Sequence, residues 1–370
     1  MKIGIDARML GYSGIGRYIK NLIQKVLQID QENEYLIFIQ KGQKGNQQST
    51  IHQQEKVKII EVDAPIYSIK EQYNFLKTTA REKLDVMHFT HFNVPLLYHG
   101  PFVVTIHDLT PLYFPGKKRN SFLQRFAYQL ILKKALKGAQ RIIAVSKFTK
   151  QDIIKHFPDV RQKIVVIYEG VGEPLRIKES EKKLPKPYLL YVGVWREHKN
   201  LVGLIRAFNQ VKSFGQKHQN WLQGLKLILV GKPDPYYPEV PETAHLSPFS
   251  KDIIFTGFLS EEELAFLYQN AEAFVFPSFY EGFGLPPLEA MSYQTPVISS
   301  KAGALPEILQ DAALYFNPYQ TDQMAEKIIQ LLTNSKLKQE MIEKGLRQMK
   351  KYSWTKMAQE TLKQYQIAAS

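Results

Sequence analysis

Two glutamates, Glu281 and Glu289, lie on either side of the segment Gly-Phe-Gly-Leu-Pro-Pro-Leu. An ionised carboxylate can accept two O–H hydrogen bonds at once, which suits the vicinal hydroxyls of a sugar or a ribose. The two glycines let the backbone approach a ligand, and the two prolines fit the first turn of a helix whose amides favour phosphate or sugar oxygens. From the residues alone, this is either a ligand site or an ordinary capped loop.

A second candidate is His198-Lys199-Asn200, which lies between an apolar strand pattern and a helical pattern. A lysine there can reach a diphosphate, while the following helix start supplies amides. Arg196 is a candidate second cation two residues earlier. A lone lysine at a helix start is also a common solvated surface residue, so the position alone does not decide.

Polar residues also follow strand patterns in the first half of the chain. His107 and Asp108 end an apolar run that starts at Phe102, where side chains project from the edge of a sheet. Such a pair can equally be a helix cap. Ser146 lacks the G-x-S-x-G context of a nucleophilic serine and is predicted to cap a helix.

The segment from Gly11 to Tyr18 contains Gly14, Gly16 and Arg17 and is predicted to join the first strand to the first helix. Its backbone could approach a phosphate or another ligand. The glycine spacing G-x-x-G-x-G differs from the dinucleotide fingerprint G-x-G-x-x-G. The segment is therefore a ligand-approaching loop or a structural turn.

The elements that must position these residues are short apolar, β-branched runs alternating with helical patterns, which is typical of parallel α/β sheets. Because ligands lie at the carboxyl ends of such strands, the polar residues above are in the expected places. Thirteen strands are predicted: 2–8, 34–40, 57–62, 86–90, 102–107, 141–145, 164–168, 188–194, 225–231, 253–258, 273–277, 296–299 and 313–316. From 335 onward the pattern is helical, with a break near Tyr352-Ser-Trp354.

A chain of 370 residues favours two domains over one. The stretch from Gly172 to Pro187 is rich in proline and charge, as a linker would be. We therefore expect an N-terminal domain at 1–178 and a C-terminal domain at 179–354. Each should be a doubly wound α/β unit.

With these elements in view, the stretch from Ser278 to Met291 resembles the Glu-x7-Glu signature of glycosyltransferase family 4. This family contains retaining enzymes of GT-B fold, in which two Rossmann-like domains face each other across a cleft. Further segments fall in the order of the family: Ile5-Asp-Ala-Arg8, Gly14-Ile-Gly-Arg-Tyr18, Thr105-Ile-His-Asp108, Ala144-Val-Ser-Lys-Phe148, Tyr191 to Leu201, Leu229-Val-Gly231 and Gly303-Ala-Leu-Pro-Glu307. The resemblance thus covers nearly the whole chain.

The resemblance implies roles for individual residues. Glu289 would hold the nucleotide ribose, Glu281 would hold the donor sugar, and His107 would lie near that sugar. No protein nucleophile is implied: substitution would occur at the front face, with a donor phosphate oxygen taking the acceptor proton. Because no obligatory metal or other cofactor is implied, Lys199 and Arg196 would stabilise the leaving diphosphate. The remaining substrate-binding candidates are Gly14, Gly16, Arg17, Asp108, Gly282, Phe283, Gly284 and Leu285.

Two features depart from or extend the family pattern. Many members have an arginine after the glycine of the strand that begins at Tyr188, whereas this chain has Val194, so Arg196 is only a substitute candidate. The tail at 355–370 resembles the C-terminal helix that completes the N-terminal, acceptor-side domain in this fold.

The composition of 44% hydrophobic and 23% charged residues is that of a globular protein. No apolar run approaches the length of a membrane span and no signal-peptide pattern is present, so a cytoplasmic protein is expected. The net charge is +14, and the region Lys117–Lys163 has thirteen Lys or Arg against two Asp. With neighbouring aromatics, this region could dock on anionic lipid at the inner membrane face or be a solvated basic face. No compact nucleic-acid recognition module is present, so no nucleic-acid partner is expected.

The predicted function is transfer of a hexose, with GDP-mannose as the favoured donor, to a glycan or lipid-linked acceptor in polysaccharide or glycolipid synthesis. Transfer from UDP-glucose, UDP-galactose or another UDP-sugar is the alternative within the enzyme class. A sugar-nucleotide epimerase or a phosphorylase of the same fold is a further alternative, although nothing indicates a pyridoxal lysine. A nucleotide-sugar-binding protein without catalysis is the alternative of another class, and turnover would distinguish it.

Overall fold

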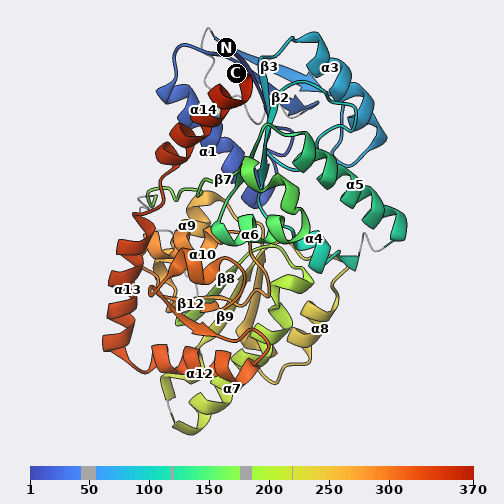
Figure 1. Cartoon of the computed structure of the whole chain (residues 1–370). Coiled ribbons are helices and arrows are strands. Elements are labelled where there is room, and N and C mark those ends of the chain that lie inside the picture. The colour runs from blue at the N-terminus through green and yellow to red at the C-terminus, as the bar shows by residue number, and fades with distance from the viewer. Residues whose placement is uncertain (43–55, 118–120, 176–185, 219) are drawn as a thin grey trace. The chain divides into compact units, whose positions relative to one another are not determined.

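A computed structural model describes residues 1–42, 56–117, 121–175, 186–218 and 220–370 (Figure 1). Lys118, Arg119 and the middle of the expected linker lie outside these described residues. The chain forms two compact units. The first unit comprises Met1–Leu109, Asn120–Gly170 and Ser353–Ser370, and the second comprises Thr110–Arg119 and Val171–Tyr352.

The first unit is built on a seven-stranded parallel sheet in the order β3-β2-β1-β4-β5-β6-β7. Its strands are rich in Val, Ile and Phe and largely buried, because helices cover both faces of a parallel sheet. The order runs outward in both directions from β1 and β4, so the sheet is doubly wound. The strands are β1 Lys2–Asp6, β2 Glu34–Gln40, β3 Val57–Val62, β4 Val86–Phe89, β5 Phe102–Ile106, β6 Arg141–Ala144 and β7 Ile164–Val166.

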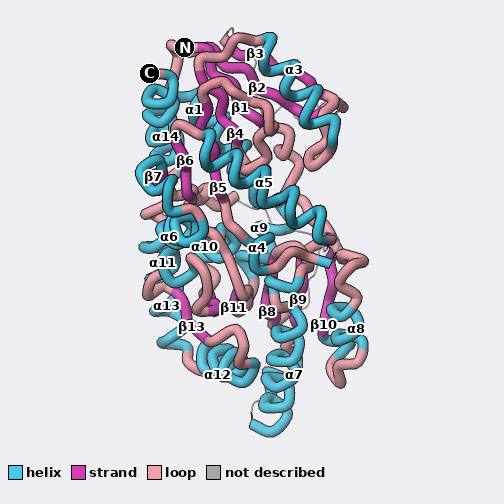
Figure 2. Tube along the Cα trace, turned by 45° about the vertical axis from the view of Figure 1, so that its right-hand side comes forward, coloured by secondary structure: helices cyan, strands magenta, loops and turns pink. Residues whose placement is uncertain are grey.

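Helices flank this sheet, as Figures 1 and 2 show. The C-terminal helix α14 contacts α1 and also β4, β5 and β6, so the end of the chain packs in the first unit. Helix α6 begins after Ser146, whose side chain accepts from the N–H of Thr149, which confirms the predicted cap. The helices of this unit are α1 Ser13–Ile29, the π-helix η1 Glu71–Phe75, α3 Leu76–Arg81, α5 Phe122–Gly138, α6 Lys147–His156, the 3-10 helix η3 Pro158–Lys163 and α14 Trp354–Ala369.

The second unit is built on a six-stranded parallel sheet in the order β10-β9-β8-β11-β12-β13. It is doubly wound as well, and its order reverses between β8 and β11. The strands are β8 Tyr188–Val192, β9 Lys226–Val230, β10 Ile253–Gly257, β11 Ala273–Phe276, β12 Val297–Ser300 and β13 Ala313–Phe316. All thirteen predicted strands are therefore present, with ends that differ by at most two residues.

Helices also cover this second sheet: α10 contacts β11 and β12, while α12 contacts α7 and β13. The predicted break in the C-terminal helical region is confirmed, since α13 ends at Met349 and α14 begins at Trp354. The helices of this unit are α4 Thr110–Tyr113, η4 Glu197–Lys199, α7 Leu201–His218, η5 Asn220–Gly224, α8 Glu239–His245, η6 Ser250–Asp252, α9 Glu261–Asn270, α10 Leu285–Ser292, α11 Leu305–Leu309, α12 Thr321–Leu332 and α13 Ser335–Met349.

The segment 110–117 packs in the second unit, although the sequence places it inside the expected first domain. Its Phe114 ring stacks on Phe279 with centroids 6.2 Å apart. Lys117 donates its backbone N–H to the hydroxyl of Tyr237 and forms an ion pair of 2.8 Å with Glu239. Aromatic and charged contacts of this kind between distant segments leave no trace in local composition, on which the sequence boundary was based.

Candidate active site

Lys199 and Glu281 form an ion pair in the second unit, with 2.6 Å between Nζ and Oε1. Lys199 ends η4, which follows β8, and Glu281 lies in the loop after β11. These strands are neighbours at the point where the strand order reverses, which is where open α/β sheets bind ligands. Both side chains are mostly buried, with exposed fractions of 14% and 12%.

Backbone hydrogen bonds hold the turn and the loop together. The N–H of Phe279 donates to the carbonyl of His198 at 2.7 Å. Asn200 has a left-handed φ of 55°, and its side-chain amide donates to the carbonyls of Pro277 and Pro318. Asparagine tolerates this conformation better than most residues do, so its place here has a structural reason. The Lys199 ammonium is thereby held on a rigid turn.

A third loop supports Glu281 from the carboxyl end of β12. The N–H of Ala304 donates to the carbonyl of Glu281 at 2.9 Å. Gly303 has φ +57°, and a Cβ there would lie 2.4 Å from the same carbonyl oxygen, so only glycine allows this approach. Gly284, with φ +102°, caps α10, which begins at Leu285. The predicted glycine turn and helix start are both present.

Glu289 lies inside α10, and its carboxylate accepts from the hydroxyl of Tyr268 at 3.2 Å. The Tyr268 ring is stacked on Tyr293 at 5.7 Å. Glu281 thus contacts a cation, whereas Glu289 contacts a phenol hydroxyl. This arrangement differs from that of two carboxylates that act together as a general acid and a general base. Tyr268 was not singled out in the sequence, because it lies at the end of α9 and not after a strand.

The turn that carries Lys199 is electropositive. His198 is buried, and burial followed by the charges of Lys199 and Arg196 lowers the pKa of its imidazole to about 2. His198 is therefore neutral at pH 7, and the positive charge of this turn comes from Lys199 and the exposed Arg196. Lys199, which is held by its ion pair, and the exposed Arg196 are two cations after β8 that could stabilise a diphosphate.

In the first unit, His107 uses both ring nitrogens. Nε2–H donates to the carbonyl of Thr90 at 3.0 Å, and Nδ1 lies 3.0 Å from the Glu169 carboxylate. Both partners are acceptors, so the arrangement favours the imidazolium. Burial opposes the charge, but the hydrogen bond and charge of Glu169 outweigh it and raise the pKa of His107 above its ordinary value. The structure thus places, directly after β5, a histidine whose protonated form is stabilised by Glu169.

Hydrogen bonds and ring contacts continue from His107 into the core. Its ring lies edge-on to Tyr18 at 4.8 Å, and the Tyr18 hydroxyl is 3.0 Å from Thr105 Oγ1. His88 bridges Thr105 and Tyr365, at 2.8 and 2.7 Å. Burial and the charge of His107 lower the pKa of His88 to about 3, so His88 is neutral. Through Tyr365, the helix α14 thus supports the strand end that carries His107.

Gly14, Gly16 and Arg17 lie in the first turns of α1 and not in a preceding loop, because the helix already begins at Ser13. The N–H of Gly16 donates to the carbonyl of Tyr12 at 2.8 Å. A Cβ at Gly16 would lie 2.3 Å from the carbonyl oxygen of Leu10, whereas a Cβ at Gly14 meets nothing within 4 Å. Close packing therefore explains Gly16 and does not explain Gly14.

The predicted site residues are thus divided between the two units. The first unit holds Gly14, Gly16, Arg17, His107 and Asp108, and the second holds Arg196, Lys199, Glu281, Gly282, Phe283, Gly284, Leu285 and Glu289. Glu169 was missed, although it follows β7 at the carboxyl end of the strand, where the other polar candidates were found. Among the described residues, no three His, Asp or Glu side chains are grouped as a metal site would require.

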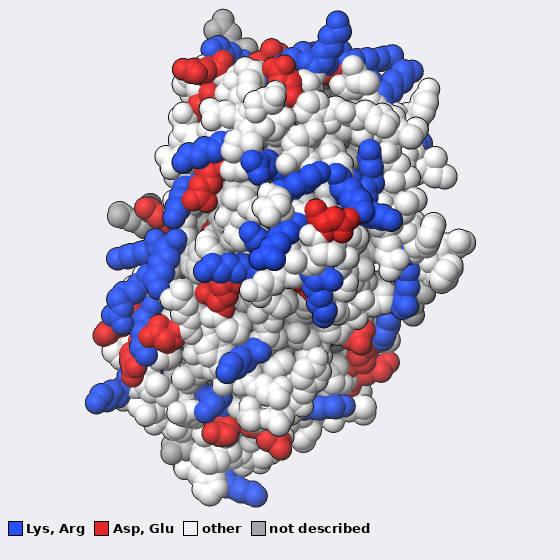
Figure 3. All heavy atoms as spheres, viewed as in Figure 1, with Lys and Arg blue, Asp and Glu red and all other residues white. Residues whose placement is uncertain are grey.

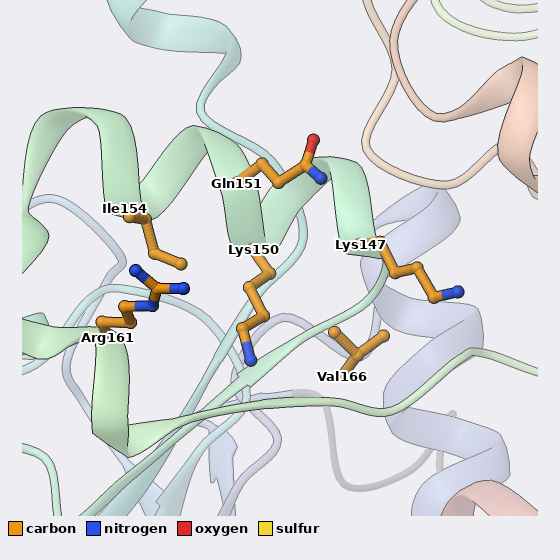
Figure 4. Close-up of a pocket in the computed structure, with 6 residues that line it drawn as sticks. All are labelled: Lys147, Lys150, Gln151, Ile154, Arg161 and Val166. Carbon is orange, nitrogen blue, oxygen red and sulfur yellow. The ribbon is translucent and has the colours of Figure 1, made fainter.

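A separate groove of about 400 Å³ lies along α6 in the first unit (Figure 4). Three cations line it, Lys147 and Lys150 from the first turn of α6 and Arg161 from η3. Figure 4 shows the Lys150 side chain between Val166 on one side and Arg161, beside Ile154, on the other. Lys and Arg also dominate the charged surface of the face drawn in Figure 3. This groove is suited to anions.

Comparisons with known proteins agree with the fold. Residues 12–172 match the profile of Glycosyltransferase Family 4, and residues 173–348 match that of Glycosyl transferases group 1. The chain is 30% identical to the O-antigen chain mannosyltransferase B of Escherichia coli over 295 residues, which are 73% of this chain and 74% of that protein. The chain belongs to glycosyltransferase family 4, a class of enzymes that build glycans.

A second relative is the O-antigen chain mannosyltransferase RfbU of Salmonella typhimurium, 34% identical over 229 residues. The match covers 62% of this chain and 60% of that protein. Among solved structures, sucrose-phosphate synthase from Thermosynechococcus elongatus superposes with a TM-score of 0.79 at 19% identity, covering 99% and 98% of the two chains. Anabaena Alr3699/HepE, solved with UDP and glucose, has a TM-score of 0.74 at 18% identity and covers 98% of both chains. These structures establish the GT-B fold.

Proposed function

We propose that this protein transfers mannose from GDP-mannose to a glycan or a lipid-linked glycan, with retention of the anomeric configuration. The observation that carries the proposal is the Lys199–Glu281 pair at the strand-order reversal of the second unit. It joins a cation suited to a diphosphate with a carboxylate suited to sugar hydroxyls. The mannose assignment is supported by the two O-antigen mannosyltransferases, which are 30% and 34% identical.

A donor diphosphate would compete with Glu281 for Lys199. The ammonium would then pair with phosphate oxygens, and Glu281 would be released to accept hydrogen bonds from the donor sugar. Glu289 and the Tyr268 hydroxyl, 3.2 Å apart, form an acceptor and donor set for the ribose hydroxyls. The backbone of the loop at 282–285 would line the sugar.

In the transfer step the bond between the anomeric carbon and the donor phosphate oxygen breaks, and the acceptor oxygen bonds to the same face of that carbon. The acceptor proton passes to the departing phosphate oxygen. Lys199 and Arg196 stabilise the charge that develops on the diphosphate, so no metal is required. The first unit, which holds His107, is proposed to bind the acceptor.

We propose that the enzyme is cytoplasmic and docks at the inner membrane face, where it meets a lipid-linked acceptor. Among the described residues no helix is long and apolar enough to cross a bilayer. The start of α5 exposes Phe122, Leu123 and Phe126, with exposed fractions of 81%, 76% and 58%. The same helix carries Arg125, Lys133 and Lys134. Exposed apolar side chains on a helix with basic residues are suited to an anionic membrane surface. Lys117 does not belong to this surface, because it pairs with Glu239 in the second unit.

Thermal-shift measurements with GDP, UDP and ADP sugars test the donor, because a ligand that binds the native state raises its stability. We expect GDP-mannose to raise Tm and UDP-glucose to leave it unchanged. Release of GDP together with formation of a mannosylated product would establish catalysis. A rise in Tm with UDP-sugars alone would replace mannose with the UDP-sugar alternative, and binding without turnover would identify a nucleotide-sugar-binding protein.

A further inference from the structure

Aromatic rings of the first unit lead away from His107. The His91 ring is stacked on His107 with centroids 6.4 Å apart, and Phe92 lies 4.1 Å from His91. Tyr67 lies 6.3 Å from His91, and Tyr128 is edge-on to Phe92 at 4.9 Å. We refer to Tyr67, His91, Phe92 and Tyr128 as the aromatic row. It joins the loops after β3 and β4 to helix α5.

The backbone of Tyr67 is strained. Its φ is +65°, a left-handed conformation that is unfavourable for a bulky residue and natural for glycine. The side chain is 39% exposed, so burial of the ring does not explain its presence. Strain of this kind persists where the surrounding structure imposes it, and it is concentrated at functional sites.

A buried ionic network imposes this conformation. Arg8 is 1% exposed and pairs with Asp6 at 2.7 Å and with Glu71 at 2.9 Å. The Glu71 carboxylate accepts the backbone N–H of Tyr67 at 2.9 Å and lies 3.4 Å from the side-chain amide of Asn93. Buried ion pairs add little net stability relative to apolar packing, so their geometric effect matters more here. They fix the two loops that carry the aromatic row.

The row also presents an unsatisfied polar group. The Tyr128 hydroxyl is buried, and within the described part of the chain it has no hydrogen-bond partner. Asp108 is close enough to add to the effect of burial in raising the pKa of Tyr128. A buried hydroxyl without a partner is rare in native proteins and indicates a missing ligand group or water.

We propose that the aromatic row binds a neutral pyranose of the acceptor glycan, with Tyr67 as a specificity-determining residue and Arg8 and Glu71 as positioning residues. The exposed Tyr67 ring and the half-buried His91 ring cover an apolar C–H face of the sugar, and the buried Phe92 supports them from beneath. A sugar hydroxyl that enters between Tyr128 and Asp108 bonds to both side chains. The proposal rests on the proposed function, since it assigns the acceptor side of that reaction. His107 at one end of the row places the acceptor next to the candidate catalytic group.

The test is the substitution Tyr67→Gly, which removes the ring and suits the left-handed backbone. We expect Tm to stay equal or rise and the acceptor KM to rise at least tenfold. The donor Kd and the slow hydrolysis of donor without acceptor should stay unchanged. Tyr67→Phe keeps the ring, so its acceptor KM should be close to that of the wild type. The matched control is Tyr73→Ala, because Tyr73 is 65% exposed on the following helix and lies outside the row.

Saturation-transfer NMR with methyl α-mannoside, methyl α-galactoside and methyl α-glucoside gives a readout that does not depend on the donor. If one of these glycosides binds the wild type and Tyr73→Ala but not Tyr67→Gly, the result supports saccharide binding by the aromatic row. A large fall in Tm, or an unchanged acceptor KM and unchanged saccharide binding, overturns it. A wild-type protein that binds no nucleotide sugar would instead refute the proposed function, so the two failures are distinguishable.

Discussion

Lys199 and Glu281 are 82 positions apart in the sequence, and their side chains meet at 2.6 Å. The pair is shielded from water, and the Lys199 ammonium also lies 5.5 Å from the Phe276 ring centroid. A lysine held in this way is positioned before any substrate arrives, which lowers the cost of ordering it during the reaction. Because Glu281 already pairs with the Lys199 ammonium, a donor diphosphate would have to compete with Glu281 for it.

Replacement of Lys199 by alanine should mainly slow turnover. Loss of one group that stabilises developing charge costs about 10²- to 10³-fold in kcat, and we expect a fall of about 10²-fold with a smaller change in the donor KM. Steady-state release of nucleotide measures both constants. Lys217→Ala, an exposed lysine at the end of α7, is the control and should be neutral. An unchanged kcat with a raised KM would assign Lys199 to ground-state binding alone.

Replacement of Glu289 by alanine should mainly weaken donor binding. A hydrogen bond to a charged group contributes about 1.5–3 kcal/mol, so we expect the donor Kd to rise about 10- to 100-fold. Tyr268→Phe keeps the ring stacked on Tyr293 and should have a smaller effect. Isothermal titration with the nucleotide diphosphate measures both. Glu326→Ala, on the exposed face of α12, is the control, and a normal Kd in Glu289→Ala would exclude the ribose role.

Strands and helix ends were predictable because local rules determine them. Apolar β-branched runs located all thirteen strands, and the Ser146 cap followed from its place before a helical pattern. Lys199 and Glu281 were both predicted to be site residues, and both lie after strands of the second sheet. Their direct pairing was not predicted, because it requires β8 and β11 to be neighbours in the sheet. Local sequence patterns do not determine the order of strands in a sheet.

Contacts between distant segments account for what was missed. Glu169 follows a strand, as the other polar candidates do, but its contact with His107, 62 residues earlier, is not visible in the sequence. The left-handed φ of Tyr67 accompanies a hydrogen bond from its N–H to Glu71, which Arg8 holds in place. No local sequence pattern predicts this conformation. Likewise, the segment 110–117 packs in the second unit through Phe114 and Lys117, which a boundary drawn from composition could not reveal.

Glu169→Gln should change how stability depends on pH. The folded-state pKa of His107 is raised, so the stability from its charged form is fully present below its unfolded pKa, about 6.5, and is lost as pH rises through the folded value. Removing the carboxylate charge lowers that folded pKa. We therefore expect the variant to lose more unfolding free energy at pH 5.5–6.5 than at pH 9, as measured by urea unfolding.

NMR titration of His107 should show the same shift directly, with a lower pKa in Glu169→Gln than in the wild type. Glu173→Gln, an exposed glutamate four residues later, should leave both the titration and the stability profile unchanged. Equal loss of stability at all pH values would mean that Glu169 acts only through packing.

Phe122→Ser with Phe126→Ser should weaken binding to vesicles that contain phosphatidylglycerol. Full burial of a phenylalanine contributes about 1.5–3 kcal/mol, so loss of two partly inserted rings should lower the affinity at least tenfold. Co-sedimentation measures the bound fraction. Trp221→Ser removes an exposed aromatic of the second unit and should bind normally. Equal binding to phosphatidylcholine vesicles, or no loss in the double variant, would contradict membrane docking through α5.

Gly14→Ala and Gly16→Ala separate a ligand role from a packing role in the first turns of α1. A Cβ at Gly16 collides with the carbonyl of Leu10, so Gly16→Ala should cost about 1–3 kcal/mol of unfolding free energy. Gly14→Ala meets no atom within 4 Å and should gain up to about 1 kcal/mol from helix propensity. If the backbone at Gly14 approaches a substrate, Gly14→Ala will lose activity while its Tm rises. A stable Gly14→Ala enzyme with normal kcat and KM would show that its glycine is dispensable and that only Gly16 is constrained.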